Sequence, residues 1–210
     1  MTFDTLFLFV VSSILLAITP GPTMLLALSN GISGGMRRAG WGIAGASLGS
    51  VTVITAVALG LGSLMAASEV LFNALRVAGV LYLVWLGVKM WRSPPPDVAA
   101  AIAQQDESPQ GGKALMRSLA VALSNPKSVL FFAAFLPQFI DTTLPQVHQY
   151  IVLGGIFVAL DTCVMLAYAS AGTQAVRWMS RRSLQRLNHG CAAGMWALAA
   201  MLAFWRRPGA

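Results

Sequence analysis

The sequence predicts an all-α integral membrane protein, and three observations lead to this fold class. Of the 210 residues, 57% are hydrophobic and 10% are charged, whereas a soluble domain carries about 25% charged residues. Residues 5–36, 39–68 and 187–205 contain no Asp, Glu, Lys or Arg, and each segment exceeds the roughly 18 apolar residues that indicate a membrane-spanning helix. In residues 142–176, Asp161 is the only charged residue. We therefore expect a multi-pass protein of the plasma membrane, surrounded by the lipid bilayer.

The apolar segments predict six transmembrane helices, at residues 3–28, 39–66, 70–91, 117–140, 149–173 and 189–206. A polar loop at residues 93–112 contains a triproline, which favours extended polyproline II, and has too little apolar content to pack. We expect one membrane transport domain over residues 1–210, with a first half at 1–92 and a second half at 113–210. Because each half has an odd number of helices, related halves would form an inverted repeat across the membrane.

The first helix is expected to remain in the protein. A secretory signal peptide begins with a positively charged region. Residues 1–4 contain no basic residue, and the apolar segment continues through Pro20 and Pro22. These features favour a retained first span over a cleaved signal.

The distribution of Lys and Arg predicts the orientation in the membrane. Basic residues follow the first, third and fifth helices, at Arg37, Arg38, Lys89, Arg92, Lys113, Arg117, Arg177, Arg181, Arg182 and Arg186. The alternate connections hold Glu69 and Asp141 and no basic residue. Under the positive-inside rule the basic connections are cytoplasmic, including the polar loop, and both termini lie outside; Arg206 and Arg207 run against this pattern. The net charge of +7 therefore sets orientation and does not predict a nucleic-acid partner.

Prolines interrupt the first and fourth predicted helices. The first contains Thr19-Pro20-Gly21-Pro22-Thr23, and the fourth contains Asn125-Pro126-Lys127. A proline removes a backbone donor and frees carbonyl groups, which a membrane tolerates only where protein or a water-filled cavity satisfies them. An isolated proline is explained by an ordinary helix kink. Interrupted helices at corresponding places of two inverted halves instead indicate a transporter binding site, so we expect substrate to bind at these residues.

Three ionisable residues must lie inside predicted helices. Too few neutral residues separate Arg76 from Lys89, or Lys127 from Asp141, to form a span without the first of each pair. A charge at the bilayer centre costs at least about 2.5–3.5 kcal/mol. Asp161 is too short to reach the interface, so we expect it to serve in binding or ion coupling. The alternative for Asp161 is a structural ion pair with Arg76 or Lys127, and Arg76 itself could instead extend to the outer interface.

These residues together predict a mechanism. The turn after Pro22 exposes the backbone N–H groups of Thr23 and Met24, which suit an anionic carboxylate at the N-terminus of a half-helix. Asp161 could then hold the ammonium group of the substrate, or the proton that drives exchange. An Asp161→Asn variant that keeps full driven transport would exclude both roles.

Small residues predict close packing of helices. Gly45-x-x-x-Gly49 and Gly190-x-x-x-Gly194 are both patterns that let two backbones approach. We favour packing inside the bundle, and a homo-oligomer stays open.

Several motifs, in order and nearly from end to end of the chain, resemble the LysE/RhtB family of amino acid exporters. They are Thr19-Pro20-Gly21-Pro22, the glycine-spaced segment from Gly34 to Gly49, the segment Val77–Gly87, Asn125-Pro126-Lys127 with Phe131-Phe132, and Leu136-Pro137-Gln138-Phe139. The resemblance implies a six-helix plasma-membrane exporter of amino acids or similar small metabolites, driven by the proton gradient. The family's candidate functional positions correspond to Pro20, Gly21, Pro22, Asn125, Pro126, Lys127 and Asp161. It does not identify the substrate, because family members export chemically different amino acids.

Other classes of function are less well supported by the sequence. An enzyme or redox carrier would need a nucleophile with its base, metal ligands or a cysteine pair, and the chain has no HExxH, GxSxG or CxxC motif. We therefore expect no catalytic residue, metal or cofactor. A passive small-solute channel is the main alternative, and it differs from an exporter because it shows no accelerated exchange with preloaded substrate. A purely structural subunit would have no use for Asp161 or for paired helix breaks.

Overall fold

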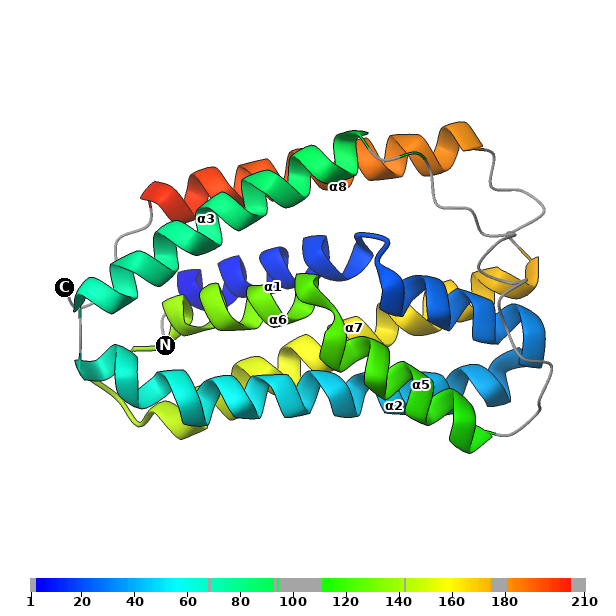
Figure 1. The fold of residues 1–210 in the computed structure, drawn as a ribbon, viewed down its shortest axis with the longest axis horizontal. Coiled ribbons are helices and arrows are strands. Elements are labelled where there is room, and N and C mark those ends of the chain that lie inside the picture. The colour runs from blue at the N-terminus through cyan, green and yellow to red at the C-terminus, as the bar shows by residue number, and fades with distance from the viewer. Residues whose placement is uncertain are drawn as a thin grey trace.

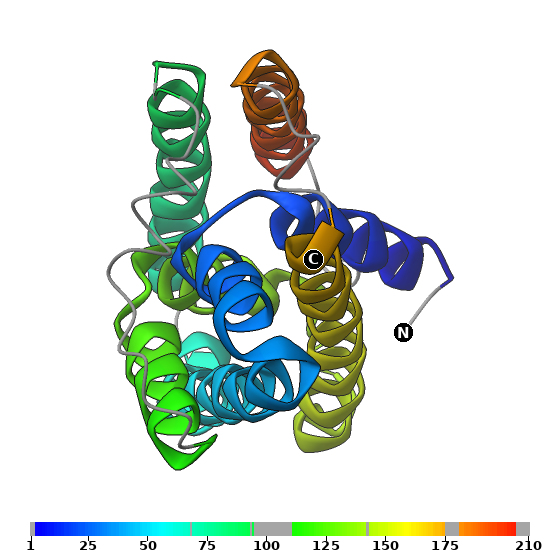
Figure 2. The same ribbon diagram turned by 90° about the vertical axis from the view of Figure 1, so that its right-hand side faces the viewer.

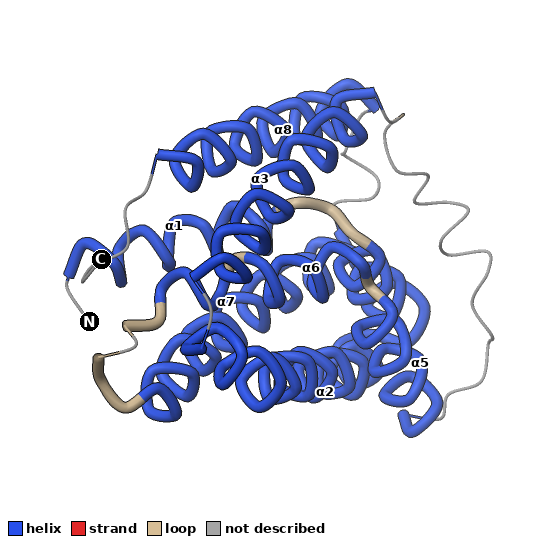
Figure 3. The backbone as a smooth tube through the Cα atoms, turned by 60° about the vertical axis from the view of Figure 1, so that its left-hand side comes forward, coloured by secondary structure: helices blue, strands red, loops and turns tan. Residues whose placement is uncertain are grey.

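The computed structural model describes residues 3–67, 69–92, 94, 111–141, 143–174 and 181–204. Within these ranges every regular element is a helix (Figure 3), so the predicted all-α class is confirmed. The elements are α1 (Phe3–Ile18), α2 (Pro22–Ala67), α3 (Glu69–Arg92), α5 (Gly111–Ser124), α6 (Pro126–Ala134), the 3₁₀ helix η1 (Leu136–Phe139), α7 (Gln146–Gln174) and α8 (Arg181–Phe204). Most of the predicted polar loop, residues 95–110, lies outside the described residues.

The helices run back and forth along one axis (Figure 1). α1 and the beginning of α2 run from left to right, and α2 then reverses and returns to the left. α3 runs to the right again, whereas α5 and α6 run to the left, α7 to the right and α8 to the left. The beginning of α1 and the end of α8 therefore lie at the same end of the molecule.

Gly35 makes the reversal inside α2 possible. Its backbone has φ 63° and ψ −170°, while its neighbours on both sides are helical. This combination of angles is open almost only to glycine, because a Cβ atom would collide with the backbone. A single residue therefore replaces the loop that the sequence predicted between residues 28 and 39.

Several predicted boundaries were wrong, and prolines or basic residues explain most of the differences. The predicted helix 3–28 is interrupted at residues 19–21, and 117–140 is interrupted at residue 125 and begins earlier, at residue 111. The predicted helices 149–173 and 189–206 begin at residues 146 and 181. The sequence placed the basic residues before residue 189 in a loop, but a helix can continue beyond the apolar layer. The predicted helix 70–91 agrees with α3 within one residue at each end.

The helices have the length and composition of membrane spans to different degrees. Pro22–Gly60 and Gln146–Ala171 are each long and apolar enough to cross a bilayer. α5 together with Pro126–Phe139 adds a third span if this pair, bent by 52°, crosses as one unit. By this criterion the described residues contain two or three spans, and the arrangement of six spans stays a prediction.

Two groups of helices can be distinguished. Seen along the axis, α3 and α8 lie side by side and apart from the group formed by α1, α2, α5, α6 and α7 (Figure 2). α3 packs chiefly against α8, while α2 packs against α5 and α7. We call these groups the outer pair and the inner group.

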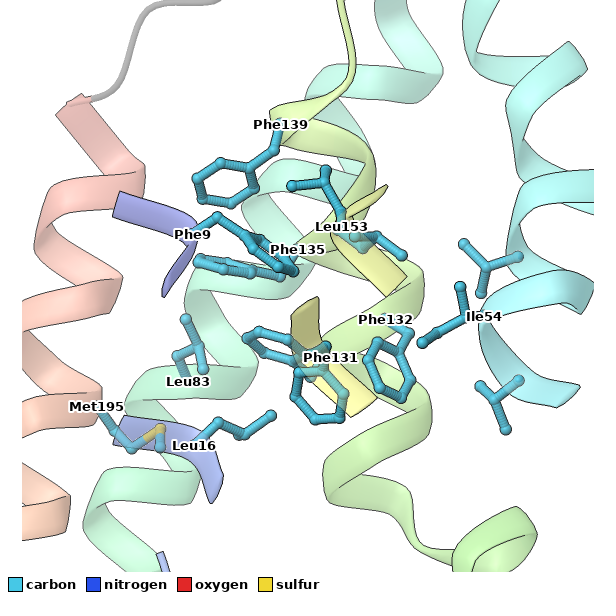
Figure 4. Close-up of a cluster of buried hydrophobic side chains, with 14 of the residues drawn as sticks. Phe9, Leu16, Ile54, Leu83, Phe131, Phe132, Phe135, Phe139, Leu153 and Met195 are labelled. Atoms are coloured by element: carbon cyan, nitrogen blue, oxygen red, sulfur yellow. The ribbon is translucent and has the colours of Figure 1, made fainter. Parts of the chain in front are cut away.

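An apolar cluster joins the two groups. α6, η1 and the residue between them contribute Phe131, Phe132, Phe135 and Phe139, whose rings pack against one another and against rings from α1 and α7 (Figure 4). Leu83 of α3 and Met195 of α8 belong to the same buried cluster. The short helix after the second break is therefore held on several sides, which fixes where that break lies.

Glycines let the inner helices approach closely. A Cβ atom at Gly45 would overlap the carbonyl oxygen of Leu115 in α5, and one at Gly49 would overlap Ala122 of the same helix. The expected packing of these two glycines inside the bundle is therefore confirmed. Gly194 lies near Leu15 of α1, whereas Gly190 has open space around its Cα atom.

Candidate functional site

The two breaks expected from the sequence are present. α1 ends at Ile18 and α2 begins at Pro22, so Thr19, Pro20 and Gly21 connect them without helical structure. α5 ends at Ser124 and α6 begins at Pro126. Both following helices start with proline, which lacks only a donor that the first turn leaves unpaired in any case. The prolines thus end one helix and begin the next at each break.

Lys127 connects the two breaks directly. Its Nζ atom donates a hydrogen bond of 2.8 Å to the backbone carbonyl oxygen of Thr19, a residue 108 positions earlier. Lys127 is 8% exposed and Thr19 is 1% exposed. The carbonyl groups at the end of α1 have no helical partner, and a cation is favourable there because the carboxyl end of a helix carries partial negative charge. Lys127 thus satisfies a freed carbonyl in the other half of the chain.

Asn125 caps the second break. Its side-chain Oδ1 atom accepts a hydrogen bond of 3.1 Å from the backbone N–H of Lys127, which makes Asn125 the N-cap of α6. The side chain is 3% exposed. Its Nδ2 atom is buried and has no hydrogen-bond partner among the described residues. One half of this amide therefore caps α6, and the other half is buried without a partner among the described residues.

A cavity of about 250 Å³ lies against the two breaks. From the breaks it is lined by Thr19, Pro20, Gly21, Pro22, Asn125, Pro126 and Lys127, and from the outer pair by Tyr82, Trp85, Leu86, Lys89, Met90, Pro94 and Asn188. The structure therefore brings together nearly all of the residues that were expected around the prolines. Among the described residues that line this cavity there is no Asp or Glu.

The contribution of the outer pair was missed in the sequence. Tyr82, Trp85 and Lys89 lie one turn apart on α3, and Asn188 comes from the first third of α8. The available signal was Asn188, a buried polar residue at the start of the charge-free segment 187–205. Which face of α3 meets the breaks depends on how two distant helices pack, and the sequence pattern does not give that.

Asp161 lies on α7, close to the breaks but outside the cavity lining. The side chain is 8% exposed, and it interacts electrostatically with Lys127. The next residue, Thr162, forms a hydrogen bond of 3.1 Å with Ser47 of α2, which fixes α7 beside the inner helices. Asp161 is thus placed to act on the cavity through Lys127.

Two further residues of the expected set have a different position. Thr23 belongs to the first turn of α2, and neither Thr23 nor Met24 is among the residues lining the cavity. The backbone of Arg76 is part of α3, but its side chain lies outside the described ones. An ion pair between Arg76 and Asp161 therefore stays a prediction.

Comparison with known proteins identifies relatives along almost the whole chain. The family model of the LysE type translocator matches residues 14–205. A homoserine/homoserine lactone efflux protein of Salmonella typhi is 34% identical over 204 residues, which cover 97% of this chain and 98% of the relative. A leucine efflux protein of Klebsiella pneumoniae is 29% identical over 185 residues, with 86% and 85% covered. An uncharacterized membrane protein of Vibrio cholerae is 32% identical over 181 residues, with 86% and 87% covered. No solved structure matches the chain.

Proposed function

The chain belongs to the family of LysE type translocators, and from this premise we propose that it exports amino acids or closely related small metabolites from the cell by secondary active transport. Membership in this family makes the protein a membrane transporter and excludes an enzyme. The relatives named for homoserine, its lactone and leucine support a substrate of amino acid size.

The observation that carries the proposal is the cavity at the two joined breaks. Its volume of about 250 Å³ is below the roughly 300–1,000 Å³ of sites for drug-sized ligands. A free amino acid matches such a volume better than a peptide. Thr19, Asn125 and Lys127 supply buried polar groups at the cavity.

The proposal includes six membrane spans in two inverted halves. The helix directions in Figure 1 support it, because α1 with the start of α2, the rest of α2, and α3 run right, left and right, and the second-half helices run left, right and left. The interrupted helices take the same place in each half, α1–α2 in the first and α5–α6 in the second. In transporters built from inverted repeats, substrate binds near the membrane midplane at such interruptions.

The location of the cavity suits loading from the cytoplasm. Lys89 and Pro94 line it from the carboxyl end of α3, and Asn188 lines it from the first third of α8. These helix ends lie towards the basic connections, which the positive-inside rule assigns to the cytoplasm. An exporter takes up its substrate on that side.

Asp161 is the proposed coupling residue. A proton arriving at Asp161 would remove the negative charge that acts on Lys127, and Lys127 holds the break of the other half through Thr19. Proton binding on α7 would thereby alter the contact between the two interrupted spans. This link supports exchange of substrate for protons. Arg76 stays in the proposal as a second partner of Asp161.

Counterflow in proteoliposomes tests the function. The full-length protein, reconstituted into vesicles preloaded with unlabelled L-homoserine or L-leucine, should accelerate entry of the same labelled amino acid. An imposed proton gradient should then drive labelled substrate uphill. If preloading does not accelerate the entry of labelled amino acid, and the flux only follows the concentration difference, the result would favour a passive channel. No flux of any amino acid would reject the proposed substrate class.

A further inference from the structure

Two residues that line the same cavity each carry a buried donor group with no hydrogen-bond partner among the described residues. The groups are the Nδ2 atom of Asn125, at the second break, and the hydroxyl of Tyr82, on α3. A buried polar group that lacks a hydrogen bond costs about 1–3 kcal/mol, so proteins leave few of them. When two such groups from separate helices meet at one cavity, a ligand is the simplest source of the missing bonds.

The orientation of the Asn125 amide is fixed by the protein. Its Oδ1 atom accepts from the backbone N–H of Lys127 at 3.1 Å, so the Nδ2 group is the half that stays unpaired. An amide nitrogen can only donate hydrogen bonds. The missing partner of Asn125 must therefore be an acceptor atom, such as a carboxylate or carbonyl oxygen.

Tyr82 adds a second donor from the outer pair. Its hydroxyl is buried and has no hydrogen bond among the described residues. The same side of α3 brings Leu86 and Met90, which are both 8% exposed, to the cavity. The Nζ atom of Lys89 lies over the ring of Trp85, 5.0 Å from the ring centre. α3 thus presents a polar group, apolar side chains and a cation to one space.

The charges at the cavity select for an acceptor-rich ligand. Two ammonium groups, those of Lys89 and Lys127, border it, and no acidic residue is among the described residues that line it. Such a set favours a negatively charged group. The described lining offers no counter-charge for the ammonium group of an amino acid.

We propose that the Nδ2 group of Asn125 and the hydroxyl of Tyr82 bind the carboxylate of the exported amino acid, and that Leu86 and Met90 contact its side chain. Tyr82 is then a substrate-binding residue supplied by the outer pair, and the carboxylate site lies between the two groups of helices. This assignment rests on the proposed function. It replaces the backbone N–H groups of Thr23 and Met24, which do not line the cavity, as the carboxylate site.

The test uses a variant that should not harm the fold. Because the Tyr82 hydroxyl has no partner in the described protein, Tyr82→Phe should keep the melting temperature of the detergent-solubilised protein. Removing a hydrogen bond to a charged group should raise the half-saturating concentration for L-leucine or L-homoserine counterflow about tenfold or more, with an unchanged maximum rate. The matched control is Tyr150→Phe, since Tyr150 lines a separate groove between α2 and α7.

Substrate analogues supply a second readout that needs no variant. L-Leucinol lacks the carboxylate of leucine, and L-homoserine lactone keeps a carbonyl oxygen without the negative charge. In the wild type, L-leucinol should compete for leucine counterflow at least about tenfold more weakly than leucine, because it loses a hydrogen bond to each donor. L-Homoserine lactone should compete more strongly than L-leucinol and more weakly than leucine. In Tyr82→Phe, the three compounds should differ less in how strongly they compete.

The outcomes separate this assignment from the proposed function. Two results with intact counterflow would place the carboxylate elsewhere and leave a cavity that holds water only. One is an equal half-saturating concentration for Tyr82→Phe and Tyr150→Phe, and the other is competition by leucinol as strong as that by leucine. A Tyr82→Phe protein that fails to fold would overturn the unpartnered hydroxyl on which the assignment depends. A wild type that shows no counterflow with any amino acid would reject the proposed function, and this assignment with it.

Discussion

The inner group and the outer pair of helices are built on different principles. In the inner group, backbone approaches backbone, since a Cβ atom at Gly31 or Gly45 would overlap the carbonyl group of Ala169 or Leu115. The outer pair is joined through large side chains. Trp91 stacks on His189 with ring centres 4.2 Å apart and on Trp196 at 5.5 Å, and the Trp196 indole N–H donates to the Val84 carbonyl oxygen at 3.2 Å.

This difference has a functional meaning. The inner group holds the interrupted helices and the charged residues Lys127 and Asp161 in a close-packed frame, where small displacements are costly. The outer pair contributes the remaining wall of the cavity from continuous helices. The binding chemistry is thus divided between a rigid frame and a separate pair of helices, and variants in each region should have different effects.

Replacing Lys127 by Met should have the largest effect, because it removes a side-chain hydrogen bond that joins the two breaks. The buried carbonyl of Thr19 would lose its donor, and a hydrogen bond to a charged group is worth about 1.5–3 kcal/mol. We expect counterflow to fall roughly tenfold to a hundredfold. Lys113→Met, an exposed position in the first turn of α5, is the matched control. Equal transport by the two variants would mean that the breaks do not need this contact.

Asp161→Asn should have a narrower effect, confined to coupling. The amide keeps the size of the side chain but carries no charge and cannot take up a proton as a carboxylate does. Uphill transport driven by a proton gradient should be lost, while exchange between preloaded and labelled substrate should persist. Asp4→Asn, at an exposed position in α1, should change neither. If Asp161→Asn still concentrates substrate fully, the coupling role belongs elsewhere.

Gly45→Ala should show how rigid the inner group is. The added methyl would overlap the Leu115 carbonyl oxygen, and extra atoms in a close-packed region typically cost about 1–3 kcal/mol. The melting temperature in detergent should therefore fall. Gly155→Ala has open space around its Cα atom and should be neutral or slightly stabilising. In the outer pair, the nearest atoms to a Cβ atom at Gly87 belong to the side chain of Trp196. The melting temperature should therefore fall less for Gly87→Ala than for Gly45→Ala.

Trp196→Phe should have the smallest effect of these variants. The ring stack on Trp91 would largely remain, but the hydrogen bond to the Val84 carbonyl would be lost. Such a bond contributes about 0.5–1.5 kcal/mol. Thermal denaturation should detect a modest loss, with little change in the half-saturating substrate concentration, because Trp196 does not line the cavity. A large loss of affinity would mean that the inner group and the outer pair act as one unit.

Local chemistry explains which parts of the fold could be predicted. Pro20, Pro22 and Pro126 interrupt helices wherever they occur, because they lack a backbone donor, and the breaks were found at these residues. The reversal at Gly35 was not predicted, since a glycine within a helical pattern does not reveal that its φ is positive. The starts of α5 and α8 were misjudged because the basic residues there were placed in loops.

The candidate site was predictable only in part. Residues 19–22 and 125–127 were expected to form one binding site, because interrupted helices at corresponding places of two inverted halves indicate one. The contact of Lys127 with Thr19 joins these two segments. Asn188 was visible as a polar residue at the start of a charge-free segment, but no pattern pointed to Tyr82, since the place of both residues at the cavity depends on the packing of α3 and α8. Asp161 was expected in the same pocket, but it lies beyond Lys127 and outside the lining.

The central claim is that the exported amino acid binds in the cavity between the two breaks and the outer pair, and substrate protection of a cysteine tests it most directly. Met90 lines this cavity, whereas Met116 of α5 is 61% exposed and does not. In a protein whose own Cys163 and Cys191 are replaced by Ser, a cysteine introduced at each position would be labelled with a small thiol reagent. A transported amino acid should slow the labelling of Met90→Cys and leave the labelling of Met116→Cys unchanged. Equal labelling of Met90→Cys with and without saturating substrate would contradict the claim.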